Sequence, residues 1–153
     1  LIPGRTNRLS LQPTKSGTYR GQCAEFCGRS HALMAFPVVV MQPGDFESWL
    51  GARGNASPGV GASRSAETLF LRHGCGDCHR VDGTQARGTS GPDLSHVGSR
   101  LTIGTSLMTN DAETMARFIA HSQSLKPGSL MPTYLDMPSA DLDAISSWLK
   151  GLQ

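Results

Sequence analysis

The sequence predicts two domains, a mostly β piece over residues 1–50 and an all-α piece over residues 65–153, joined by a flexible linker over residues 51–64. Two observations favour this division. Apolar residues recur with a period of about two before the linker and of about 3.6 after it, which are the periods of strands and of helices. The linker contains almost no large apolar side chain, so nothing in it can be buried to offset the entropy of the chain.

Short strand patterns account for most of the first piece. Residues 17–22 follow a turn-like Thr-Lys-Ser-Gly segment, and residues 36–41 are rich in β-branched valine. After them we expect Asp45 to cap one or two turns of helix that carry Phe46 and Trp49 on one face. The piece is below the size at which a core alone usually sustains a fold.

Three amphipathic helices are expected in the second piece. The first begins near Ser65, the second follows a capping-box pattern that starts at Asn110, and the last begins at Ser139. Gly- and Pro-rich loops lie between them, at residues 88–93 and 126–132. Such loops bury little by themselves, so we expect them to wrap around a bound group.

Charge and hydropathy argue against two classes of protein. The 14 basic and 12 acidic residues give a net charge of +2 and are scattered, which gives nucleic-acid binding no support. The longest apolar stretch, residues 35–41, is far too short to cross a bilayer. The chain opens within a strand and turn pattern and has no initiator Met, so we expect a fragment or a processed product.

Five consecutive residues, Cys75-Gly-Asp-Cys78-His79, form the CxxCH signature of covalent haem attachment. Two thiols add to the vinyl groups of a porphyrin, and the next residue brings an imidazole to the iron. A CxxC redox pair and half of a zinc site are the alternatives for the motif alone. Met131 favours haem, because it lies in a Pro-flanked loop before the last helix and offers a thioether as sixth ligand, whereas Met137 is expected in the core.

A second group of metal ligands lies in Cys23-Ala-Glu-Phe-Cys27-Gly-Arg-Ser-His31-Ala-Leu-Met34, which places two thiols, an imidazole and a thioether within twelve residues. This mixture favours copper, because zinc binds thiolate and imidazole but has little use for a thioether. Two bridging sulfurs can hold two copper ions close enough to share one unpaired electron. A Cys23–Cys27 disulfide and a structural zinc site are the alternatives.

Through the CxxCH motif, the Gly-Pro-Asp-Leu segment and the Met131 loop, residues 65–153 resemble a class I cytochrome c domain. The resemblance implies a covalent haem c on the two cysteines, with His79 and Met131 as the axial iron ligands. In that family the Pro of Gly-Pro-Asp-Leu gives its carbonyl to the proximal imidazole, which assigns this role to Pro92.

Through the copper loop and its flanking strands, residues 1–50 resemble the C-terminal part of the cupredoxin-like CuA domain of cytochrome oxidase subunit II. The resemblance implies a dinuclear copper centre, CuA, in which Cys23 and Cys27 bridge both ions, His31 and the carbonyl of Glu25 bind one, and Met34 binds the other. It also implies a Mg²⁺ ion at the Glu25 carboxylate, where the catalytic subunit would meet this one.

The same family supplies one more copper ligand, a His from an upstream strand, and none of residues 1–22 is a His. The membrane hairpin that precedes this strand in the family is absent as well. We expect truncation rather than a degenerate site, and we expect the chain by itself to hold copper weakly.

A subunit II fused to cytochrome c is the pattern of the caa-type haem-copper oxidases of bacteria. The resemblance implies an electron relay from haem c to CuA and on to subunit I, where oxygen is reduced, at the periplasmic face of the plasma membrane. The expected partners are subunit I, other oxidase subunits and a cytochrome c or quinol-oxidising complex as electron donor, with membrane attachment through a preceding segment.

No acid, base or nucleophile constellation appears in the sequence, so the chain is expected to be a component of an enzyme without a complete catalytic site of its own. Two alternatives remain at this point. The first is a stand-alone copper and haem electron carrier. The second is another CuA enzyme, such as a nitrous oxide reductase.

Overall fold

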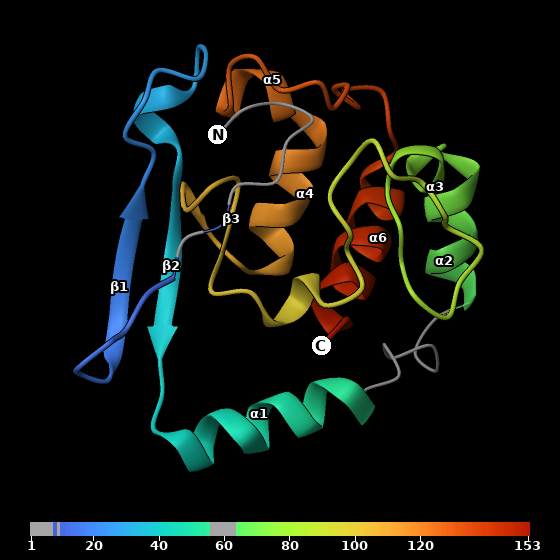
Figure 1. The fold of residues 1–153 in the computed structure, drawn as a ribbon. Coiled ribbons are helices and arrows are strands. Elements are labelled where there is room, and N and C mark those ends of the chain that lie inside the picture. Colours follow the sequence, from blue (N-terminus) through green and yellow to red (C-terminus); the bar gives the residue numbers. More distant parts are fainter. Residues whose placement is uncertain (1–7, 9, 56–63) are drawn as a thin grey trace.

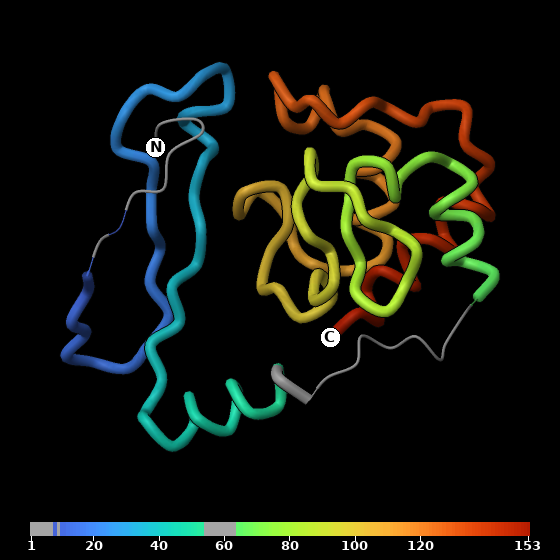
Figure 2. The backbone as a smooth tube through the Cα atoms, turned by 45° about the vertical axis from the view of Figure 1, so that its right-hand side comes forward, coloured from blue at the N-terminus to red at the C-terminus, as the bar shows by residue number. Residues whose placement is uncertain are grey.

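A computed structural model describes residues 8, 10–55 and 64–153, and it places a two-stranded hairpin and one helix beside a helical body (Figure 1). The hairpin and the body lie side by side, with the helix α1 below both (Figures 1 and 2). The two-part organisation expected from the sequence is therefore present in outline. The two parts differ in how they are stabilised.

The hairpin consists of β1, Gly17–Gln22, and β2, Ala35–Val40. The strands pair antiparallel, with Gly17 opposite Val40 and Gln22 opposite Ala35. A Cβ atom on Gly21 would lie 2.4 Å from the ring of Phe36, so a glycine is needed where this ring crosses the strand pair. The twelve residues between the strands form a loop that ends in the 3₁₀ turn η1, His31–Leu33.

Helix α1 spans Pro43–Asn55 and is longer than the one or two turns expected. Pro43 is at its first position, where the fixed φ of proline suits a helix start. The helix extends into the stretch 51–64 expected as a linker, because Arg53 lies 5.2 Å from the Trp49 ring and donates a hydrogen bond to Ser99. This corrects the linker boundary, whereas residues 56–63 lie outside the described residues.

Three helices form the core of the second part, namely α2, Arg64–Arg72, α4, Ala112–Ala120, and α6, Ser139–Gly151. Helix α6 packs against both of the others. The rings of Phe70 and Trp148 meet edge to face with their centroids 5.3 Å apart. Short elements complete the part, and they are α3, Cys75–Cys78, η2, Val97–Ser99, and α5, Ser122–Leu125. Among the described helices, none has the length and apolar character needed to cross a bilayer.

The second part is not all-α, because two short strands, β3, Thr102–Ile103, and β4, Met108–Thr109, pair antiparallel. The chain reverses between them through three consecutive residues with left-handed backbone, Gly104 (φ 61°), Thr105 (φ 64°) and Ser106 (φ 63°). The strands are too short to leave a period-two pattern in the sequence. The expectation of an all-α second domain is therefore wrong at this hairpin.

The cap of α4 lies one residue later than expected. The carboxylate of Asp111 accepts a hydrogen bond from the amide of Thr114 at 2.7 Å. The side chain of Asn110 instead donates to the carbonyls of Val97 (2.8 Å) and Arg100 (2.6 Å). Asn110 therefore ties η2 to the start of α4, and Asp111 begins the helix.

Candidate copper and haem centres

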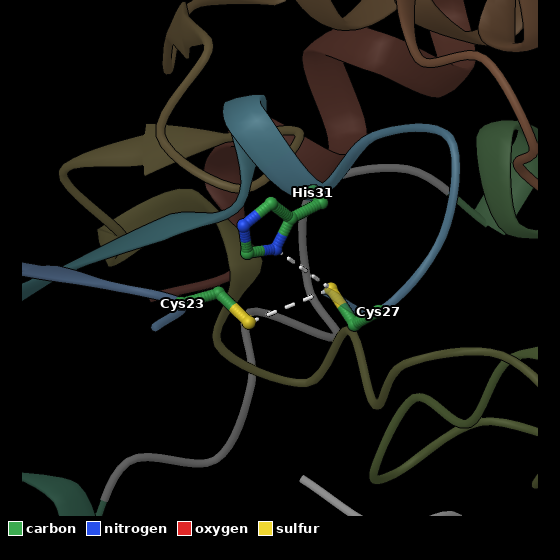
Figure 3. Close-up of side chains that lie close together, drawn as sticks. All are labelled: Cys23, Cys27 and His31. Atoms are coloured by element: carbon green, nitrogen blue, oxygen red, sulfur yellow. Dashed lines mark hydrogen bonds between the residues drawn. The ribbon is translucent and has the colours of Figure 1, made fainter. Parts of the chain in front are cut away.

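Donor atoms of the loop between β1 and β2 converge on one small region (Figure 3). The Sγ atoms of Cys23 and Cys27 are 3.5 Å apart, and Cys27 Sγ lies 3.6 Å from His31 Nδ1 and 3.5 Å from Met34 Sδ. Cys23 Sγ also lies 3.2 Å from the carbonyl oxygen of Glu25. The structure thus brings together all five residues that the sequence predicts as copper ligands in this chain.

Backbone hydrogen bonds close this copper loop, which we define as residues 23–34. The amide of Cys23, just beyond the end of β1, donates to the carbonyl of Met34 at 3.0 Å. The amide of His31 donates to the carbonyl of Gly28 at 3.0 Å, and Gly28 has a φ of 124°. The positive φ favours glycine here, and the resulting turn brings His31 back toward the thiols.

The Cys23 thiol is close enough to affect the ionisation of Cys27. A hydrogen bond with Cys23 is the main cause that raises the pKa of Cys27, with desolvation and the negative charge of the Cys23 thiolate adding to it. Both thiols must lose their protons to bind a metal ion, and a cation between them compensates for two thiolates at this distance. Two thiolates, an imidazole, a thioether and a carbonyl are a donor set that fits copper.

Within the part of the chain that the structure describes, Cys23, Cys27 and His31 form the one group of three or more His, Cys, Asp or Glu residues that could hold a metal ion. The Glu25 carboxylate is exposed and accepts a hydrogen bond from the amide of Phe26 at 3.1 Å. It belongs to no such group among the described residues. A magnesium ion at Glu25 thus stays a prediction.

The CxxCH motif forms the single helical turn α3, with His79 directly after it. The Nδ1 atom of His79 lies 2.7 Å from the carbonyl oxygen of Pro92. A carbonyl can only accept, so Nδ1 carries the proton and the lone pair of Nε2 is free to bind a metal. A Cβ atom on Gly91 would lie 2.6 Å from the His79 ring, so only a glycine allows the loop to pass this close.

The two cysteines of the motif differ in exposure. Cys75 is buried and Cys78 is exposed. Burial raises the pKa of the free Cys75 thiol to about 11. The loop that leads to Pro92 packs directly on this turn, because a Cβ atom on Gly88 would overlap the backbone of Cys78. Two thiols one turn apart, beside an imidazole with a free Nε2, are a donor set that fits a covalently attached haem.

Met131 is half-buried and packs against the core cluster that contains Cys75. Its amide donates to Ser129 Oγ at 3.2 Å, and the hydroxyl of Ser122 lies 3.0 Å from the carbonyl oxygens of both Met131 and Pro132. Ser122 is fully buried, with a relative exposure of 0 %. The loop is therefore held on both sides of Met131.

Met137, the alternative thioether, is buried in the core, as the sequence predicts. Ser122 was not predicted from the sequence as a functional residue, because an isolated serine at the start of the short helix α5 has no pattern that distinguishes it from a helix cap. Its burial is the signal, and burial appears only in the structure.

Of the histidines outside the motifs, His73 has an acidic partner. Its Nε2 atom lies 2.8 Å from Asp141 Oδ2, and Arg72 donates to the same oxygen at 2.9 Å. The hydrogen bond from His73, followed by that from Arg72, lowers the pKa of Asp141. These contacts join the end of α2 to the start of α6 and lie outside both donor groups.

Comparisons with known proteins match the two parts separately and the chain as a whole. The cytochrome c family model matches residues 63–153, and the model of the periplasmic domain of cytochrome c oxidase subunit II matches residues 1–42. Cytochrome c oxidase subunit 2 of Alkalihalophilus pseudofirmus is 34 % identical over 154 residues, covering 99 % of this chain and 44 % of the relative.

Cytochrome c oxidase subunit 2 of Bacillus sp. PS3 is 32 % identical, covering 90 % of this chain and 40 % of the relative. The corresponding subunit of Bacillus subtilis is 31 % identical, covering 87 % of this chain and 39 % of the relative. The chain thus spans about two fifths of the length of these curated relatives.

Proposed function

We propose that this chain relays electrons from haem c to CuA and on to oxidase subunit I. The chain belongs to the cytochrome c oxidase subunit II family, in its form with a C-terminal cytochrome c domain. The observation that carries the proposal is the convergence of Cys23, Cys27, His31 and Met34 in the same chain as the CxxCH motif. The relatives are oxidase subunits, so a stand-alone carrier or a nitrous oxide reductase is not favoured.

In the haem centre, Cys75 and Cys78 would carry the porphyrin, and His79 and Met131 would bind its iron. Pro92 holds the tautomer of His79 in which Nε2 is free for the metal. A haem with imidazole and thioether ligands supplies one-electron chemistry at a raised potential. Hydrogen bonds hold the two loops, so neither proposed ligand would have to move when an electron enters or leaves.

In the copper centre, Cys23 and Cys27 would bridge two copper ions, His31 and the Glu25 carbonyl would bind one, and Met34 would bind the other. The thiolates supply the covalent contact through which the two ions share charge. The Glu25 carboxylate, exposed beside this centre, would contribute to a Mg²⁺ site at the contact with subunit I.

The proposed setting follows from the family. The copper and haem centres would face the extracytoplasmic side of a bacterial plasma membrane, with membrane attachment through another segment of the protein. Subunit I and other oxidase subunits would be partners, and a cytochrome c or a quinol-oxidising complex would deliver the electrons. The reduction of oxygen would take place in subunit I.

Metal analysis and paramagnetic resonance test the proposal. In a form of the protein that also supplies the upstream His, we expect two copper ions per haem iron and a seven-line mixed-valence spectrum on copper loading, whereas this chain by itself should hold copper weakly and lack that spectrum. Met34→Ala should remove this spectrum, whereas Met41→Ala, which changes a methionine outside the donor group, should not. Two results would refute the copper assignment. One is a single bound zinc ion per chain, and the other is a Cys23–Cys27 disulfide that is found after the protein has been reduced and then loaded with copper.

A further inference from the structure

Only two residues of the first part are buried, among those described from residue 8 to residue 53. They are Ser30, with a relative exposure of 8 %, and Ala35, with 3 %. Both lie at the copper loop, whereas the rest of the hairpin and α1 are half-buried or exposed. The hairpin has too few residues to bury them by itself, and each of them contacts the helical body.

The first contact joins the copper loop to the loop that leads to Met131. The hydroxyl of Ser30 donates to the carbonyl of Pro127 at 2.5 Å. A Cβ atom on Gly128 would lie 3.5 Å from Cβ of Arg29, so the two backbones pass each other closely. In Figures 1 and 2 the loop between β1 and β2 lies on the side of the body that carries α5.

The second contact joins the end of the copper loop to the turn between β3 and β4. The amide of Ala35 donates to the carbonyl of Thr105 at 3.3 Å, and the Thr105 hydroxyl lies between the carbonyl oxygens of Gly104 (2.5 Å) and Leu33 (3.4 Å). Ser106 lines a shallow hollow together with Phe36 and Pro37 of β2. Two separate segments of the body thus contact one continuous segment of the first part.

The backbone conformation of the turn 104–106 indicates that contacts with the first part hold it in place. Thr105 and Ser106 adopt left-handed backbone with φ of 64° and 63°, which is unfavourable for a residue with a side chain, most of all for β-branched threonine. Such backbone persists where surrounding contacts hold it. The hydrogen bond from the Ala35 amide and the contact of the Thr105 hydroxyl with Leu33 are contacts of this kind.

We propose that residues 29–35 form an intrachain docking surface that seats the copper loop on the turn 104–106 and on the loop 126–128. Ser30 precedes the copper ligand His31, and Pro127 lies in the same Pro-flanked loop as the iron ligand Met131. The Ser30–Pro127 hydrogen bond therefore couples the backbones that carry one ligand of each centre. This inference rests on the proposed function and adds that the two centres are held in fixed contact.

The consequence is kinetic. With haem and copper bound, one electron would pass between the centres, which would oxidise the ferrous haem, reduce the oxidised copper pair and make or break no bond. A docked chain transfers it without a search by mobile domains, so the rate should not depend on solvent viscosity. Domains that must meet by diffusion would transfer it more slowly as viscosity rises.

Amide hydrogen exchange in the copper-free protein tests the docking by itself. The Ala35 amide should be protected in the wild-type protein. Thr105→Val keeps the backbone carbonyl that accepts from this amide but removes the hydroxyl contact with Leu33, so it should speed the exchange about fivefold, the factor expected for a typical hydrogen bond. Thr105→Ser keeps the hydroxyl and should leave the protection unchanged. Equal exchange of the Ala35 amide in the two variants would overturn the inference.

Electron transfer in the copper-loaded protein provides the second readout. Ser30→Ala should make the transfer slower and dependent on viscosity, whereas Ser30→Thr, which keeps a hydroxyl, should restore both properties. A viscosity-dependent rate in the wild-type protein would contradict fixed docking. Because the exchange experiment needs no metal, protection of Ala35 together with no copper spectrum from the form that supplies the upstream His would refute the proposed function and leave the docking intact.

Discussion

The hairpin and the helical body supply the ligands of their proposed centres in opposite ways. The copper ligands come from twelve consecutive residues in a region with almost no core of its own, and its Phe26 side chain is 76 % exposed. The proposed haem ligands, His79 and Met131, are separated by half of the second part, and Met131 packs against the core that α2, α4 and α6 form. A local motif needs few long-range contacts, whereas a dispersed site depends on the whole fold.

The largest expected effect separates the two centres. His79→Ala should remove the proximal ligand and abolish the low-spin haem spectrum, because no other imidazole stands directly after the CxxCH turn. The copper spectrum should remain, since its ligands lie in a different region. His121→Ala, at the exposed end of α4, is the control and should leave both spectra unchanged. Loss of both signals in His79→Ala would show that the copper loop cannot form without the haem.

A pair of methionine variants tests which thioether belongs to the haem centre. Met131→Ala should remove the absorption band of the sulfur–iron bond and lower the reduction potential. Met137→Ala should keep the band and lower the free energy of unfolding by about 2–4 kcal/mol, because it leaves a cavity in the core. Spectroscopy and denaturant unfolding of both variants measure the two effects. The opposite pattern would assign the ligand to Met137.

Ser122 sharpens the claim that the haem site depends on long-range contacts. Ser122→Ala should leave the carbonyls of Met131 and Pro132 without their buried donor and cost about 1–3 kcal/mol of stability. The sulfur–iron band should weaken as well, because the loop is no longer held. Ser124→Ala removes an exposed hydroxyl two residues away and serves as the control. A normal band in Ser122→Ala would limit the residue to a purely structural role.

The smallest expected effect concerns Asp141, which joins α2 to α6. Its pKa is lowered from the ordinary 3.8, so the carboxylate stabilises the fold above that pH and loses this contribution as the pH falls through the lowered pKa. Asp141→Asn should therefore slightly lower Tm at neutral pH and have no effect in strong acid. Thermal unfolding across pH measures the difference. Asp143→Asn on the same helix is the control.

Much of both sites could be predicted from the sequence, because covalent haem attachment and copper binding require particular residues at fixed spacing. Strands near residues 17–22 and 36–41 were also predicted from their patterns, and the structure has β1 at Gly17–Gln22 and β2 at Ala35–Val40. The β3–β4 hairpin was not predicted, since two-residue strands carry no periodicity. Nor were the roles of Ser122 and Thr105, whose importance arises from burial and from partners far away in the sequence.

The boundaries of elements were hardest to predict where a contact between the two parts decides them. Helix α1 continues to Asn55 while Arg53 contacts Ser99 of the helical body, and no local pattern contains that information. The cap of α4 is a similar case. Asn110 and Asp111 are both good capping residues, and the distant carbonyls of η2 determine which of them caps.

The measurement that tests the central claim most directly follows one electron inside the protein. An electron delivered to the haem by a photoexcited ruthenium complex should leave it again in a first-order phase, independent of protein concentration, as the copper band bleaches. In Cys27→Ser the haem should stay reduced. If the haem also stays reduced in the wild-type protein while its copper spectrum is present, the chain is not a relay between the two centres.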